Sequence, residues 1–149
     1  MSGLYFLTGL VAFLFMEFVA WFTHKYIMHG PMWGWHKDHH IPHDKTLEKN
    51  DRFVFIFALP GAVLIILGVV NTMPFALSAG IGIAFYGLAY FLFHDVLVHR
   101  RIKLFKETNN KVLKATVTAH LDHHKPHSNQ NFGFLIAPLK YYKQEFSKK

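Results

Sequence analysis

Ten of the twelve histidines in this chain fall into one pattern that occurs twice. The first copy reads His24-x4-His29 and then His36-x2-His39-His40, and the second reads His94-x4-His99 and then His120-x2-His123-His124. Neutral imidazole is the commonest metal ligand in proteins. Ten imidazoles exceed what one ion can take and fit two ions with about five ligands each. The repeat therefore predicts a dimetal site, with all ten histidines as candidate ligands.

The type of ligand limits which metals can bind and which chemistry they can support. An all-imidazole set suits iron, zinc, copper or nickel and disfavours calcium and magnesium. The chain has no cysteine, which excludes disulfides and thiolate ligands. It also lacks the Glu-x-x-His pairs of soluble di-iron bundles and the His-Glu-x-x-His motif of zinc peptidases. Because zinc needs no such number of ligands, the pattern favours redox-active ions and oxygen chemistry.

Three long apolar runs must position these histidines. They cover residues 3–22, 53–70 and 73–93, and Glu17 is the only charged residue within them. A helix needs about 20 apolar residues to cross a bilayer. We therefore expect an all-α integral membrane protein with three transmembrane helices, four being the alternative count, in a single domain over residues 1–149. Small residues of the third run should allow close helix packing; they are Gly80, Gly82, Ala84 and Gly87.

The basic residues predict an orientation. All sixteen Lys and Arg lie within residues 25–52 or 100–149. With three spans, both segments and all histidine boxes fall on the same side, which the positive-inside rule makes cytoplasmic. We expect a cytoplasmic helical cap that carries the dimetal site. The net charge of +7 then reflects topology and contact with anionic lipid headgroups, not nucleic-acid binding.

Local spacing predicts how each box is presented. Residues i, i+3 and i+4 share one helix face. A helix over residues 31–41 would therefore point the three histidines of the first box into one site. The second box should lie on a helix over about residues 111–125, capped by the asparagine at 109 or 110.

The H-x4-H pairs present a different geometry. On a regular α-helix, side chains at i and i+5 point about 140° apart. His24 and His29 therefore cannot easily share one ion unless the helix is distorted, and the same holds for His94 and His99. We expect each pair to straddle the end of a span and to serve different ions or different sides of one ion.

Four acidic residues are candidates for holding the ligands in place. Ligating histidines usually donate their second ring N–H to a carboxylate or a carbonyl, and Asp38, Asp95 and Asp122 lie within or beside the boxes. Asp38 and Asp122 fit water-facing helix charges equally well. Glu17 is costly inside a span and shares a helix face with His24. We expect Glu17 to hydrogen-bond a ligand histidine or to lie protonated in a substrate channel.

Motifs that flank the histidines carry a family resemblance. They include Met28-His29-Gly30, Glu48-Lys-Asn-Asp51, Phe93-His94-Asp95, Ala119-His-Leu-Asp-His-His124 and Phe132-Gly-Phe-Leu-Ile-Ala-Pro138. Over nearly the whole chain, these motifs resemble the non-haem β-carotene 3-hydroxylases, a branch of the fatty-acid hydroxylase and sterol desaturase superfamily. Residues 127–131 depart from the more glycine-rich and acidic stretch typical of that branch.

The resemblance implies a reaction, a cofactor and partners. The reaction is O2-dependent hydroxylation of carbon 3 on each β-ionone ring, which takes β-carotene through β-cryptoxanthin to zeaxanthin. The implied cofactor is a pair of iron ions, for which zinc can substitute in a purified sample, and the ten histidines match the family's ligand motif. The implied electron source is reduced ferredoxin fed by NAD(P)H. The protein's part is to hold the ions, orient the substrate and exclude water.

Some alternatives remain open on the sequence alone. A sterol or fatty-acid hydroxylase or desaturase of the same superfamily would carry the same boxes. A membrane protein that binds or transports zinc or copper is the non-enzymatic alternative, although its spans should then carry polar groups midway. His43 and His127 each follow a box by three residues and are either solvated loop residues or spare ligands. The oligomeric state is left undetermined.

Overall fold

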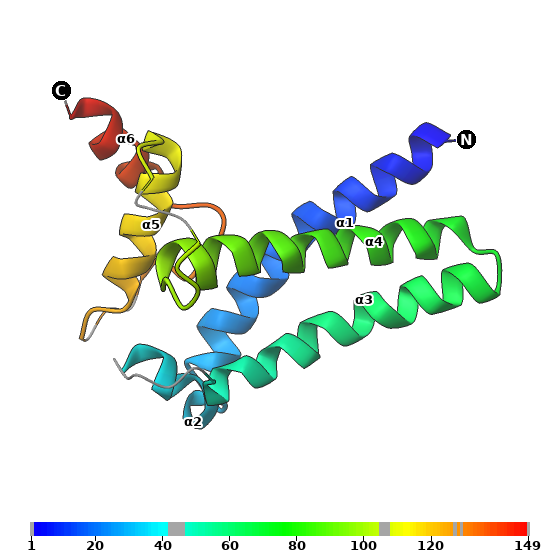
Figure 1. Ribbon diagram of the computed structural model, residues 1–149, viewed down its shortest axis with the longest axis horizontal. Coiled ribbons are helices and arrows are strands. Elements are labelled where there is room, and N and C mark those ends of the chain that lie inside the picture. Colours follow the sequence, from blue (N-terminus) through cyan, green and yellow to red (C-terminus); the bar gives the residue numbers. More distant parts are fainter. Residues whose placement is uncertain (1, 42–46, 105–107, 127, 129, 149) are drawn as a thin grey trace.

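The computed structural model describes residues 2–41, 47–104, 108–126, 128 and 130–148, and all regular structure within them is helical. Figure 1 shows a bundle of three long helices with shorter helices gathered at one end. In chain order the elements are α1 (Ser2–Phe22), η1 (Thr23–Met28), α2 (Trp33–His36), η2 (Lys37–His40), η3 (Lys49–Asp51), α3 (Arg52–Val70), α4 (Pro74–Tyr90), η4 (Phe91–Val98), α5 (Lys111–His123) and α6 (Leu139–Ser147).

Three helical stretches are long and apolar enough to cross a bilayer, which confirms the predicted all-α membrane fold. They are Ser2–Met28, Lys49–Val70 and Pro74–Val98. The first and third extend beyond the predicted apolar runs because α1 and α4 continue directly into the π-helices η1 and η4. Helix α3 runs through Pro60 as one element. Pro74 begins α4, where its missing N–H costs no helical hydrogen bond.

Helix α4 packs against both α1 and α3, and glycines permit the close approach. A Cβ atom at Gly82 would overlap the carbonyl oxygen of Gly9 on α1, and one at Gly80 would lie 2.8 Å from the carbonyl oxygen of Gly61 on α3. These contacts confirm the predicted packing role of Gly80 and Gly82. Gly87 differs, because a Cβ atom there would have no neighbour within 4 Å.

The elements that carry histidines lie at one end of the bundle. The N-terminus of α1 and the α3–α4 turn lie at the opposite end, while α2, α5 and α6 cluster where the spans finish (Figure 1). The prediction that all boxes meet on one side is therefore confirmed.

The cap helices differ in part from those predicted. The helix expected over residues 31–41 is instead α2 followed by the 3-10 helix η2. Helix α5 agrees more closely, since the side chain of Asn110 accepts hydrogen bonds from the amides of Val112 and Leu113 and caps its first turn.

Candidate metal centre

The ten box histidines gather into two adjacent sets. Five ring nitrogens in the first set lie within 4.8 Å of one another and belong to His24, His29, His36, His40 and His123. Four in the second set do the same and belong to His39, His99, His120 and His124. Nε2 of His94 lies 3.0 Å from Nε2 of His39, beside the second set. The rings of His40 and His124 stack with centroids 4.3 Å apart, which links the two sets.

Each three-histidine box divides between the two sets. The outer histidines of the first box, His36 and His40, belong to the first set, but the middle one, His39, belongs to the second. The second box does the reverse, because its middle histidine, His123, crosses to the first set. The expectation that one box serves one site is therefore wrong. Each set needs a ligand from the other half of the chain.

The H-x4-H pairs converge because the helix is distorted at both of them. In η1 the amide of His29 donates to the carbonyl of His24 at 3.1 Å, and in η4 the amide of His99 donates to that of His94 at 2.9 Å. These i to i+5 bonds define a π-helix, which brings residues five apart onto one face. His24 and His29 consequently share the first set. Of the two alternatives expected for such a pair, service to different ions is therefore wrong for His24 and His29, and a place on different sides of one ion agrees with their shared set.

Several rings are held by hydrogen bonds from Nδ1 to groups that accept them. His24 donates to the carbonyl of Phe132 and His123 to that of Gln130, each at 2.9 Å. His36 donates to Oδ1 of Asn50 at 2.7 Å, and His39 donates to Oε2 of Glu48 at 2.9 Å. Such outer contacts fix the tautomer and the ring orientation of metal ligands.

This arrangement leaves lone pairs facing each other at the centre. A neutral imidazole carries one ring hydrogen, and in His24 and His36 that hydrogen lies on Nδ1. Their Nε2 atoms nevertheless lie 3.1 Å apart. Two lone pairs at that distance repel unless a cation lies between them. The donor set therefore fits a metal ion with imidazole ligands.

Four of these histidines are also kept neutral, as metal ligation requires. Burial, reinforced by neighbouring histidines, lowers the pKa of His29 and His40 to about 3. Burial lowers the pKa of His36 to about 4 and that of His99 to about 2. Lone pairs on these rings are consequently free at neutral pH.

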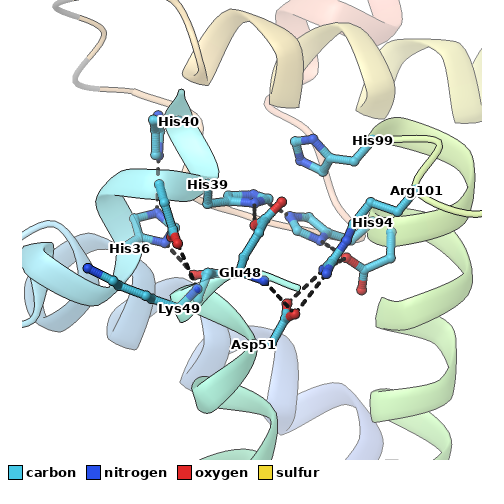
Figure 2. A network of polar contacts seen from close by, with 12 residues as sticks. His36, His39, His40, Glu48, Lys49, Asp51, His94, His99 and Arg101 are labelled. Atoms are coloured by element: carbon cyan, nitrogen blue, oxygen red, sulfur yellow. Dashed lines mark hydrogen bonds and ion pairs between the residues drawn. The ribbon is translucent and has the colours of Figure 1, made fainter. Parts of the chain in front are cut away.

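The segment Glu48-Lys-Asn-Asp51 supports both sets from below, as Figure 2 shows. Glu48 holds His39 of the second set, and Asn50 holds His36 of the first. Asp51 closes the first turn of η3 by accepting from the amide of Glu48 at 2.9 Å. From the sequence this segment is recognisable only as part of the family resemblance. Its signal was three polar side chains placed directly before an apolar span.

Arg101 connects this segment to the third span. Its guanidinium donates to both carboxylate oxygens of Asp51 at 2.7 Å and to Asp95 at 3.1 Å. Asp95 lies 3.5 Å from Nδ1 of His94. Arg101 thereby ties the start of the second span to the end of the third span at the base of the centre (Figure 2).

The other acids have partners other than the described histidine rings. Asp38 accepts from the backbone amide of Lys49 at 2.7 Å, and Asp122 accepts from the Tyr141 hydroxyl at 2.9 Å, so neither makes the hydrogen bond to a described histidine that is one of their two expected roles. Glu17 contacts backbone amides and Tyr86 instead of a ligand ring. The position i+2 in a box points away from the shared face, which accounts for Asp38 and Asp122. His43 and His127 lie outside the described residues.

Comparison with known sequences identifies the family. Residues 9–140 match the sequence profile described as fatty acid hydroxylase. The chain belongs to the fatty acid hydroxylase family. It is 39% identical over 137 residues to a beta-carotene hydroxylase of Paracoccus sp. (strain N81106), which covers 89% of this chain and 84% of the relative.

Two further relatives carry similar names. A beta-carotene hydroxylase of Pantoea ananas is 41% identical over 126 residues, covering 83% of this chain and 71% of the relative. The chloroplastic beta-carotene hydroxylase 2 of Capsicum annuum is 35% identical over 127 residues, covering 83% of this chain and 41% of the relative. No solved structure matches the chain. The predicted family resemblance is confirmed.

This family member has an apolar cavity beside the histidine sets. The cavity has a volume of about 450 Å3 and lies between α1, α3 and α4. Tyr90 and Phe134 line it and also stack on ligand rings, Tyr90 on His94 with centroids 4.6 Å apart and Phe134 on His24 with centroids 4.7 Å apart. Polar residues of the lining include Asn50, Asp51 and Asp95, two of which, Asp51 and Asp95, are bridged by Arg101. The cavity therefore adjoins the base of the centre.

The cavity reaches the lipid-facing surface between α3 and α4. Small or exposed residues form this side of its wall, namely Ala58, Ala62, Ala84 and Gly87. The two helices are close at their connecting turn and separate toward the end that carries the histidines (Figure 1). The opening follows from that separation.

Proposed function

We propose that this protein hydroxylates carbon 3 of carotenoid β-ionone rings with O2, converting β-carotene through β-cryptoxanthin to zeaxanthin. The observation that carries the proposal is the pair of imidazole sets beside an apolar cavity at the end of three membrane spans. Relatives that cover most of this chain are named beta-carotene hydroxylase. Sterol or fatty-acid hydroxylation by the same centre is the alternative within the family.

The ten histidines would hold two iron ions. His24, His29, His36, His40 and His123 would bind one ion, and the second set together with His94 would bind the other. The iron ions would supply the redox chemistry that activates O2 for insertion into an unactivated C–H bond. One oxygen atom enters the substrate, and the other leaves as water with two electrons and two protons from an external donor.

The cavity would hold one ring of the substrate. Its volume of about 450 Å3 lies in the range of small-molecule sites, and an apolar ring needs few polar partners. The opening between α3 and α4 would let the polyene chain remain among the lipid tails while the ring enters. Tyr90 and Phe134, which separate the cavity from the ligand rings, would exclude water and set the position of the ring.

The donor and the orientation complete the proposal. Reduced ferredoxin supplied by NAD(P)H would bring electrons to the cap, where exposed lysines of α5 and α6 such as Lys111, Lys140 and Lys143 suit an acidic partner.

The cap would face the cytoplasm. Because the chain has no cysteine, Ser147→Cys and Ser2→Cys can each be labelled with an impermeant thiol reagent in intact cells. Labelling of Ser147→Cys from outside the cells would overturn this orientation.

Pigment analysis tests the reaction. Expression in cells that accumulate β-carotene should yield zeaxanthin with transient β-cryptoxanthin, and His120→Ala should yield neither. A folded, iron-loaded protein that leaves β-carotene unchanged in the presence of a ferredoxin system would overturn the assignment. Hydroxylated or desaturated sterols or fatty acids in those cells would support the alternative.

A further inference from the structure

Glu17 binds a backbone segment that returns from the far end of the chain. Its Oε1 accepts from the amides of Phe134, Leu135 and Ile136 at 3.0, 3.1 and 3.2 Å. Its Oε2 accepts from the Tyr86 hydroxyl of α4 at 2.7 Å. Successive backbone N–H groups that converge in this way form a site for an anion. The bonds offset the cost of placing an ionisable side chain within a span.

The segment held by Glu17 is also the segment that orients two ligands. The carbonyl of Phe132 accepts from Nδ1 of His24, and the carbonyl of Gln130 accepts from Nδ1 of His123. The ring of Phe134 stacks on His24 with an interplanar angle of 23°. Both histidines belong to the first set. No described residue of the second set receives a hydrogen bond from this segment.

A residue with left-handed backbone geometry and a closely packed glycine shape the backbone of this segment. Asn131 has a φ of 63°, in the left-handed region. A Cβ atom at Gly133 would lie 2.7 Å from the carbonyl oxygen of Ile136 and 3.3 Å from Oε1 of Glu17. The ring of Phe134 packs with Met16, Ala20 and Tyr86 of the spans, and the hydrogen bonds to Glu17 hold the backbone beside that ring.

We propose that Glu17 is a positioning residue for the metal centre, acting through residues 130–136 on His24 and His123. The first span, formed by α1 and η1, thereby carries both His24 and the anchor for the carbonyl that orients it. The proposal rests on the proposed metal centre. It predicts a selective effect, because loss of the anchor weakens the first set and leaves the second set intact.

Titration of the metal-free full chain with Co2+ in detergent tests the proposal, with visible absorption reporting each set. Wild type should bind two ions. Glu17→Leu should weaken one of the two sites by about 10- to 100-fold, the effect typical of losing an outer contact to a ligand. Glu17→Gln should weaken the same site by a smaller but measurable factor, about two- to tenfold, since its amide oxygen can still accept hydrogen bonds but is a weaker acceptor than a carboxylate. Phe18→Leu, at an exposed neighbour on α1, is the matched control.

The outcomes separate the two proposals. Wild type that binds no Co2+ would refute the metal centre itself. Two sites of unchanged affinity in Glu17→Leu, or an equal loss at both sites, would refute the positioning role. If Glu17→Leu fails to fold while Glu17→Gln binds like wild type, Glu17 serves the fold alone and the positioning role is also refuted.

Discussion

At the scale of the residue, the centre depends on which ring nitrogen carries the hydrogen. Nδ1 of each of four histidines donates a hydrogen bond to a carbonyl, an amide oxygen or a carboxylate; they are His24, His123, His36 and His39. The Nε2 lone pairs are thereby directed inward, ready to bind a cation. These acceptors come from two segments, residues 48–51 and 130–136, that contain no ligand themselves.

Asn50→Ala tests this orientation. It removes the acceptor for His36, and we expect the affinity of the first set for Co2+ to fall by about 10- to 100-fold while the second set is unchanged. Lys49→Ala is the control, because the exposed Lys49 uses its backbone amide for its bond to Asp38. Equal titration curves for Asn50→Ala and wild type would contradict the role assigned to Asn50.

Burial of neutral histidines also predicts how stability depends on pH. Burial lowers the pKa of His36 from 6.5 to about 4 and that of His29 to about 3 in the folded protein. Between the two pKa values the unfolded chain binds more protons, so the free energy of unfolding of the metal-stripped protein falls as pH drops below 6.5. Each such histidine contributes a slope of about 1.4 kcal/mol per pH unit.

Denaturation midpoints of the metal-stripped protein between pH 7 and pH 4.5 measure this slope. His36→Gln, which cannot titrate, should show a shallower fall than wild type. A midpoint that stays constant or rises as the pH drops would contradict the prediction.

At the scale of the element, two departures from regular helix geometry build the site. The π-helices η1 and η4 align histidines five residues apart. The close crossing of α1 with α4 fixes the relative position of the two spans that end in these π-helices. Gly9 and Gly82 allow that crossing because neither has a side chain. An ordinary side chain there would push apart the helices that carry His24 and His94.

Gly82→Val should therefore destabilise the fold by about 1–3 kcal/mol, the usual cost of overpacking a close contact. It should also weaken both metal sets together, since the two spans move relative to each other. Gly3→Ala on α1 is the control, because a Cβ atom there has no neighbour within 4 Å. Thermal unfolding in detergent and Co2+ titration measure the two effects, and an unaltered melting temperature for Gly82→Val would argue against the tight crossing.

At the scale of the whole molecule, the two halves of the chain complete each other. The middle histidine of each box crosses to the set formed by the other half. Neither half alone supplies a full ligand set. The apolar cavity likewise needs all three spans, since α1, α3 and α4 each contribute to its wall.

Single-histidine variants test directly whether the middle histidine of each box belongs to the set formed by the other half of the chain. His39→Ala should weaken the second set, and His123→Ala should weaken the first, each by more than the roughly 10- to 100-fold expected for an outer contact. Co2+ spectra can assign the sets, because His99→Ala should match His39→Ala and His29→Ala should match His123→Ala. If the spectrum of His39→Ala instead matched that of His29→Ala, the assignment of His39 to the second set would be wrong.

Gly87→Phe tests the cavity as the site of the substrate ring. Gly87 lines the cavity, and a Cβ atom there has no neighbour within 4 Å. We therefore expect unchanged metal binding and a fall of about tenfold or more in kcat/KM for β-carotene, equivalent to about 1.4 kcal/mol of transition-state binding. Leu59→Trp, on an exposed lipid-facing position of α3 outside the cavity lining, should have wild-type activity. Full activity of Gly87→Phe would place the substrate elsewhere.

The sequence alone determined the spans, their number and the convergence of the histidines at one end, because apolar length and sidedness are local properties of the chain. It also predicted the family and helix α5 with a cap at Asn109 or Asn110, of which the structure shows Asn110. Tertiary structure alone decided the pairing of His39 with the second half and of His123 with the first, the partner of Glu17, and the supporting roles of Asn50 and Arg101. These features depend on contacts between residues far apart in the chain and on two π-helical distortions, neither of which a helical periodicity encodes.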